Sequence, residues 1–65
     1  MRVLINQVAY DLPNVASVAE AVAAAAAKPP FAVAVNLQFV PRTQYQSVAL
    51  QADDRIEIIS PVTGG

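Results

Sequence analysis

The chain has no cysteine and no histidine among its 65 residues. Without cysteine it forms no disulfide bonds, and the zinc sites that proteins build from cysteine and histidine are excluded. The same absence removes the thiolate nucleophile and the imidazole general base on which many enzymes depend. We therefore expect a protein that is not an enzyme and that holds no metal ion or cofactor of its own.

Charge is also scarce, with 14% charged residues and a net charge of −1. Nucleic-acid binding requires clustered Lys and Arg to neutralise phosphates, so we predict no nucleic-acid partner. The longest apolar run, residues 18–27, is interrupted by Glu20 and falls far short of the ~20 residues that span a membrane. No signal-peptide pattern follows Met1. We expect one domain over residues 1–65, cytoplasmic and without membrane attachment.

Glycine is almost absent, and the 2 that occur are the last residues, Gly64 and Gly65. Glycine has no Cβ, so this is the thinnest and most pliable backbone that a chain can present. A free carboxylate at the end of such a segment can enter an enzyme cleft in which side chains would clash. We expect residues 59–65 to form a protruding, flexible tail. The alternative interpretations are a frayed terminus and a cloning remnant.

Five segments have the alternating or β-branched character of strands. Their ranges are 1–6, 8–12, 31–36, 39–40 and 55–59. Asn6-Gln7 and Asn36-Leu37-Gln38 predict turns, because asparagine tolerates left-handed backbone. Alternation places Val3, Ile5, Ile56 and Ile58 toward the core. Leu4 and Ile59 then lie on the outer face of the sheet.

A helix is predicted between the second and third strands. Ser17 and Glu20 have the spacing of a capping box, and the alanine-rich run favours a helix through Ala27, where Lys28 complements the dipole before two prolines. The residues that share one stripe of this helix are expected to face the core. They are Val18, Ala21, Val22 and Ala25.

The predicted order is β-β-α-β-β-β, an α+β fold in which one helix covers a mixed sheet of about five strands. The right-handed crossover rule lets the last strand lie parallel beside the first. This is the ubiquitin-like β-grasp arrangement. The four aromatic residues are expected in the core or at its rim, namely Tyr10, Phe31, Phe39 and Tyr45.

Specific segments resemble the ThiS family, the ubiquitin-like sulfur carriers of thiamine biosynthesis. They are the opening strand 1–6, the block Ala-Val-Asn-Leu-Gln-Phe-Val-Pro-Arg at 34–42, and 54–59 running to Gly64-Gly65. One departure is Asp53, where the family usually turns on glycine. Aspartate tolerates left-handed backbone at modest cost, so this difference concerns stability more than assignment.

The resemblance implies a mechanism. A ThiF-like adenylyltransferase, using ATP and a metal ion, would adenylate the Gly65 carboxylate. A cysteine desulfurase would supply sulfur to form a thiocarboxylate, which a ThiG-like thiazole synthase would accept. Gly64, Thr63 and Val62 would thread into the partner, and Leu4, Ile59 and Arg42 are candidates for docking. Exposed apolar residues on the outer face suit an interface, although scattered surface apolar residues are normal.

The outer face also carries charge. Arg2, Arg55 and Glu57 are expected to form weak surface ion pairs there. Arg42 either pairs with an acidic partner, caps a loop or lies in solvent.

Three other functions stay open. A MoaD-type small subunit of molybdopterin synthase has a similar Gly-Gly end, but it is typically longer and lacks the Val-Pro-Arg block. A ubiquitin-like modifier would join target lysines through Gly65. An interaction domain with an inert tail would need neither activation nor sulfur.

Overall fold

The structure, a computed structural model, describes residues 1–60 and confirms the predicted order of elements. The elements are β1 (Arg2–Ile5), β2 (Val8–Asp11), α1 (Val18–Ala24), β3 (Ala32–Val35), β4 (Gln38–Val40), the 3-10 helix η1 (Arg42–Gln44) and β5 (Arg55–Ile59). The strands form one sheet in the order β2-β1-β5-β3-β4. The fold is therefore the expected ubiquitin-like β-grasp.

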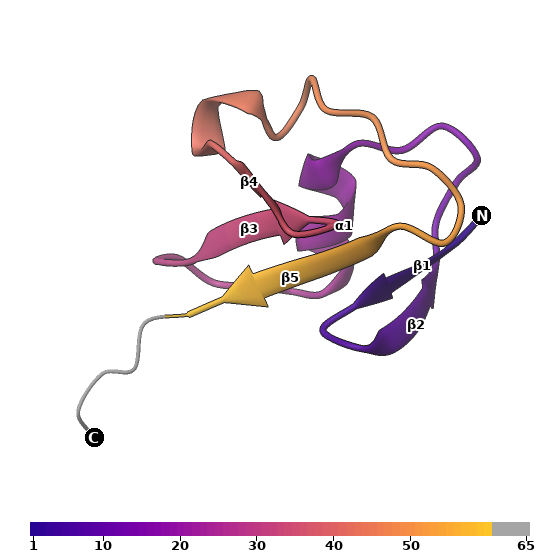
Figure 1. The fold of residues 1–65 in the computed structure, drawn as a ribbon, viewed down its shortest axis with the longest axis horizontal. Helices are drawn as coiled ribbons and strands as arrows, with labels where there is room; N and C mark the ends of the chain where they lie inside the picture. The colour runs from indigo at the N-terminus through magenta and orange to yellow at the C-terminus, as the bar shows by residue number, and fades with distance from the viewer. Residues whose placement is uncertain (61–65) are drawn as a thin grey trace.

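The last strand lies in the middle of the sheet (Figure 1). β5 pairs in parallel with β1, where Leu4 is opposite Arg55 and Ile5 is opposite Ile56. On its other side it pairs antiparallel with β3 over four residue pairs, from Ala32–Ile59 to Val35–Ile56. The antiparallel hairpins β1–β2 and β3–β4 thus flank β5 on its two sides.

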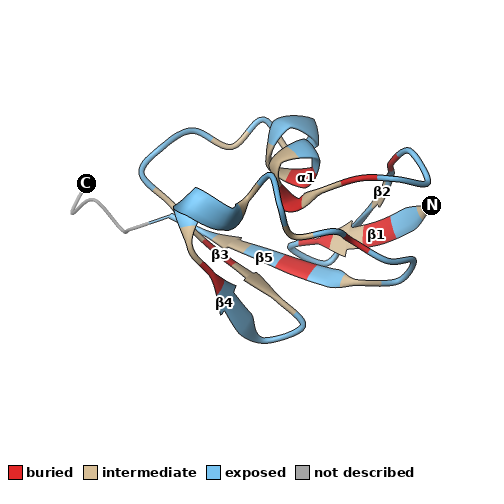
Figure 2. Ribbon diagram, turned by 90° about the horizontal axis from the view of Figure 1, so that it is seen from above, coloured by how far each residue is buried: buried red, intermediate tan, exposed pale blue. Residues whose placement is uncertain are grey.

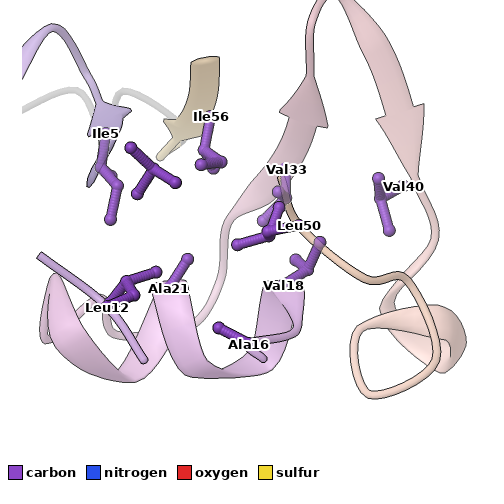
Figure 3. Close-up of a cluster of buried hydrophobic side chains, with 10 residues drawn as sticks. Ile5, Leu12, Ala16, Val18, Ala21, Val33, Val40, Leu50 and Ile56 are labelled. Atoms are coloured by element: carbon purple, nitrogen blue, oxygen red, sulfur yellow. The ribbon is translucent and has the colours of Figure 1, made fainter. Parts of the chain in front are cut away.

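The core lies between the sheet and α1 (Figures 2 and 3). Val3, Ile5 and Ile56 are almost fully buried, as the alternation predicts. They meet Val18 and Ala21 of α1, both fully buried, and the small size of these residues lets the helix lie close to the sheet. No polar or charged residue of the described chain is buried. Apolar contact therefore carries the stability of this small core.

Backbone carbonyls close the first turn of α1. The Val18 amide donates to the Val48 carbonyl at 3.0 Å, and the Ala19 amide donates to the Tyr45 carbonyl at 2.9 Å. The predicted capping box is present, and in its return half the Ser17 amide donates to Glu20 Oε1 at 3.4 Å. The chain between β4 and β5 thus satisfies amides that a helix start leaves free.

The predicted end of α1 is wrong by three residues. The helix ends at Ala24 instead of Ala27, and no basic residue lies in its last turn. Ala26 has φ 54°, its amide donates to the Ala23 carbonyl at 3.0 Å, and the Ala27 amide donates to the Val22 carbonyl at 3.2 Å. This is a Schellman motif with alanine at the position that usually holds glycine.

Two further details differ from the sequence-based expectation. Phe39 is 69% exposed because it pairs with Ala34 on the outer face of β4, so it belongs to neither core nor rim. Phe31 and Tyr45 do pack against the core, with parallel rings whose centroids are 6.0 Å apart. The turn predicted at residues 36–38 contains only Asn36 and Leu37, since Gln38 already begins β4.

The start of the predicted tail also moves. Ile59 is the last residue of β5 and pairs with Ala32, so residue 59 belongs to the sheet. Residues 61–65 lie outside the described part of the chain. No helix within residues 1–60 combines the length and apolar character needed to cross a membrane.

We expect Ala26→Gly to stabilise the protein. The left-handed conformation of alanine costs about 1–2 kcal/mol, and glycine removes this cost. Glycine also has more freedom in the unfolded chain, which lowers stability by roughly 0.5–1 kcal/mol. The net stabilisation should therefore be up to about 1 kcal/mol. Urea unfolding monitored by circular dichroism measures the difference. Ala23→Gly, inside α1, is the matched control and should lose about 1 kcal/mol. Equal losses for both variants would contradict the Schellman assignment.

Candidate functional site

The predicted chemistry lies at Gly65. The last strand before it is β5, which ends at Ile59. The candidate site is therefore the end of β5 with the hairpin tips and the outer sheet face beside it. β5 receives backbone hydrogen bonds from both neighbours. On the β1 side the Leu4 amide donates to the Asp54 carbonyl and the Asn6 amide to the Ile56 carbonyl, both at 2.9 Å.

The hairpins beside β5 have the same turn. Asn6 and Gln7 have φ of 51° and 69°, and Asn36 and Leu37 have φ of 49° and 70°. Two positive φ values in a two-residue loop define a type I′ turn, whose twist matches that of the strands. Asparagine suits the first position, but glycine is usual at the second. Gln7 and Leu37 occupy that second position without glycine's freedom.

Both turn asparagines also bind β5 through their side chains. Asn6 Oδ1 accepts a hydrogen bond from the Ile58 amide at 2.8 Å, and Asn6 Nδ2 donates to the Ile58 carbonyl at 3.2 Å. Asn36 Oδ1 accepts from the Arg55 amide at 3.0 Å. One asparagine thus holds the beginning of β5, and the other holds its end.

The turn at residues 51–54, the corner directly before β5, depends on Asp54. Its Oδ1 accepts from Asn36 Nδ2 at 3.0 Å, and its Oδ2 accepts from the Gln51 amide at 2.8 Å. The preceding residue, Asp53, has φ 69°, the departure from glycine noted in the sequence. A carboxylate with two donors closes this corner in place of a glycine turn.

The outer face carries a hollow of about 740 Å³ between the hairpin tips and β5. Its lining includes Leu4, Gln7, Leu37, Arg55 and Glu57. Leu37 is 88% exposed although it is a large apolar residue. No ion pair joins Arg55 or Glu57 to another side chain within residues 1–60, so the expected surface pairs do not form in that part of the chain. The hollow therefore presents unpaired charges beside apolar side chains.

The structure separates the predicted docking residues. Leu4 is half-buried on the outer face, and Ile59 lies on the same face with 58% of its surface exposed. Arg42 is exposed in η1, and the segment after η1 is bonded to the start of α1, on the opposite side of the sheet. Arg42 therefore does not join the other two. Val62, Thr63, Gly64 and Gly65 lie outside the described residues.

Sequence reasoning missed the side-chain roles of three residues, Asn6, Asn36 and Asp54. It assigned the asparagines to turns and did not see that they bind β5. The available signal was an asparagine directly after the inner strand in each of the segments Ile5-Asn6-Gln7-Val8 and Val35-Asn36-Leu37-Gln38. No group of three or more metal-ligating side chains occurs among the described residues.

Comparison with known proteins adds the family. The sequence profile of the ThiS family matches residues 3–65. The chain belongs to the ThiS family. The crystal structure of thiamine biosynthesis protein ThiS from Geobacter metallireducens is similar over 100% of both chains, with a TM-score of 0.81 and 17% sequence identity. At that identity the likeness shows the fold. A search of the curated proteins gives no match.

We expect Asp54→Ala to destabilise this ThiS-family chain by about 1–3 kcal/mol, because the Gln51 amide and the Asn36 side chain lose a charged acceptor. Denaturant unfolding at neutral pH measures the loss. Glu57→Ala removes the same charge from a residue without a side-chain hydrogen bond in the described chain, and should change stability by less than about 0.5 kcal/mol. Similar effects in the two variants would show that charge, not the corner, is responsible.

Proposed function

We propose that the chain is a sulfur carrier for the thiazole of thiamine and is not itself an enzyme. The observation that carries this proposal is the family match, which covers the β-grasp body and extends through residue 65. The chain therefore has both parts that a carrier needs: a folded body to be recognised and a Gly-Gly end to be modified. A cytoplasmic location stays a prediction.

The proposed chemistry begins with the Gly65 carboxylate, which is a poor electrophile because oxide would have to leave. In a ThiF-like adenylyltransferase a carboxylate oxygen attacks the α-phosphorus of ATP, pyrophosphate leaves, and an acyl-adenylate forms. The terminal sulfur of a desulfurase persulfide attacks the acyl carbon and AMP leaves. A thiol then attacks the desulfurase sulfur of the acyl disulfide, forms a new disulfide with it and expels the thiocarboxylate. The sulfur of the thiocarboxylate attacks the substrate of a ThiG-like thiazole synthase.

The carrier's own residues take no part in these bond changes. ATP and its metal ion belong to the adenylyltransferase, and Val62, Thr63 and Gly64 lie along the segment that enters the partner. The described body contributes the docking surface. We assign docking to the outer-face hollow that contains Leu4 and Leu37, with Ile59 beside the exit of the chain. Arg42 would contact only a partner that also reaches the helix side.

Leu37 supports this docking assignment. A leucine at φ 70° costs stability that glycine or asparagine would not, and its side chain is 88% exposed. Residues that break a local rule without a packing gain are expected at functional positions. A partner that covers the hollow would bury Leu37 and gain from its apolar surface.

Incubation with a ThiF-type adenylyltransferase, ATP, cysteine and a desulfurase should increase the mass of the intact chain by one oxygen-to-sulfur exchange. Intact-protein mass spectrometry measures the change. A chain lacking Gly65 should stay unmodified, because the next carboxylate would lie one residue short. No increase, with the same enzymes shown active on another carrier, would contradict the proposal.

The alternatives give different results in companion experiments. Stable assembly with only the large subunit of molybdopterin synthase would indicate the MoaD-type function. Isopeptide-linked conjugates in cell extracts that require Gly65 would indicate a protein modifier. Full pathway function after removal of Gly64 and Gly65 would indicate an interaction domain with an inert tail.

Leu37→Asn should weaken binding to the adenylyltransferase by about tenfold, since an apolar contact worth roughly 1.5 kcal/mol is lost. The same change should leave the fold intact or stabilise it, because asparagine tolerates positive φ. Isothermal titration calorimetry and thermal unfolding measure the two effects.

The matched control is Val15→Asn. Val15 is also 88% exposed, but it lies in the loop before α1 and does not line the hollow. Its substitution should not change the affinity. Unchanged affinity in Leu37→Asn, or equal weakening in Val15→Asn, would show that the docking surface lies elsewhere.

A further inference from the structure

The hydrogen bonds along the β1 side of β5 follow a regular series. The Asp54 carbonyl accepts from the Leu4 amide and the Ile56 carbonyl accepts from the Asn6 amide. The next position in steps of two is Ile58. The backbone of β1 does not reach it, because the chain turns at Asn6 with φ 51°.

The side chain of Asn6 fills that position. A primary amide presents its oxygen acceptor and one N–H donor on the same side, and both bind Ile58, at 2.8 Å to its amide and at 3.2 Å to its carbonyl. The parallel ladder is therefore extended by one side chain beyond the end of the strand. Ile58 is the last β5 residue that is held on this side by a hydrogen bond within the described chain.

We propose that Asn6 is a positioning residue for sulfur transfer. By fixing Ile58 on the side that β1 leaves open, Asn6 holds the end of β5, from which the chain continues to Gly65. This inference rests on the carrier function proposed above. Without the Asn6 side chain the end of β5 keeps only its pairing with β3, so the point from which the chain continues to Gly65 is held less firmly relative to a docked body.

Asn36 provides a matched comparison within the same molecule. It occupies the same position of the same type of turn, with φ of 49°, and it binds β5 by the same kind of side-chain contact. Its contact is with Arg55, at the start of the strand and away from the exit of the chain. Removal of either asparagine side chain loses two hydrogen bonds, one of which, for Asn36, is its bond to Asp54. Only the removal of the Asn6 side chain affects the end of β5.

The experiment compares Asn6→Gly with Asn36→Gly. Glycine adopts positive φ freely, so both turns are retained and only the side-chain contacts are lost. Hydrogen exchange should be roughly tenfold faster at the Ile58 amide in Asn6→Gly and at the Arg55 amide in Asn36→Gly, if each lost contact is a typical hydrogen bond. The unfolding temperature should fall in both variants, and at least as far in Asn36→Gly, which also loses the bond to the Asp54 carboxylate.

Steady-state thiocarboxylate formation then separates positioning from stability. In Asn6→Gly we expect kcat to fall roughly tenfold, with KM for the carrier changed less than about twofold, because misplacement of the reacting group lowers reactivity without removing docking contacts. Asn36 also lines the hollow, so in Asn36→Gly an effect on docking should change KM, whereas kcat should stay within about twofold of the wild type. Asn6→Asp keeps an acceptor for the Ile58 amide and tolerates the turn, but it loses the donor to the Ile58 carbonyl, so it should restore part of the kcat.

Several outcomes would overturn the inference. These are unchanged Ile58 exchange in Asn6→Gly, an unchanged kcat, or an equal fall of kcat in Asn36→Gly, which would indicate lost stability alone. Failure of the wild-type chain to form a thiocarboxylate would overturn the carrier function itself and this inference with it. The wild-type reaction alone identifies that case.

Discussion

The arrangement of this protein depends on holding β5 from both sides. β5 is the last element in sequence but the central strand of the sheet, so one strand of each hairpin, β1 or β3, pairs with it. On the β1 side the backbone ladder is shorter than β5, and Asn6 supplies the missing pair of contacts. The chain that continues to Gly65, the site of the proposed chemistry, therefore starts from the central strand of the sheet. The end of that strand is held by hydrogen bonds to the body of the protein.

The near absence of glycine has a cost that is visible in the backbone. Six residues without glycine's freedom have positive φ within residues 1–60: Asn6, Gln7, Ala26, Asn36, Leu37 and Asp53. The asparagines and the aspartate tolerate this conformation, since their short polar side chains bond locally. Ala26, Gln7 and Leu37 do not have that compensation. At Leu37 the strain coincides with an exposed apolar side chain that lines the hollow, the surface to which we assign docking.

Sequence patterns predicted the fold correctly because local periodicity decides it. Alternation in β1 and β5 identified the buried residues, and the spacing of Val18 and Ala21 identified the buried face of α1. The end of α1 was wrong because alanine favours helix without specifying where it stops, and the Schellman bonds depend on backbone geometry at Ala26. The Asn6 contact was missed for a different reason. It joins residues 52 apart in sequence, and only the register between β1 and β5 brings them together.

One helix covers only one face of a five-stranded sheet, and this asymmetry links the core to the proposed docking surface. The inner face is closed by α1 and by the chain from η1 to Leu50, which bonds to the start of the helix. Within residues 1–60 the outer face has no such cover, and Leu4 and Phe39 remain at least partly exposed on it. A partner bound to that face would contact β5 on the side opposite α1, without disturbing the core. Docking and exit of the chain would then share one strand, so recognition of the body would orient Gly65 through β5.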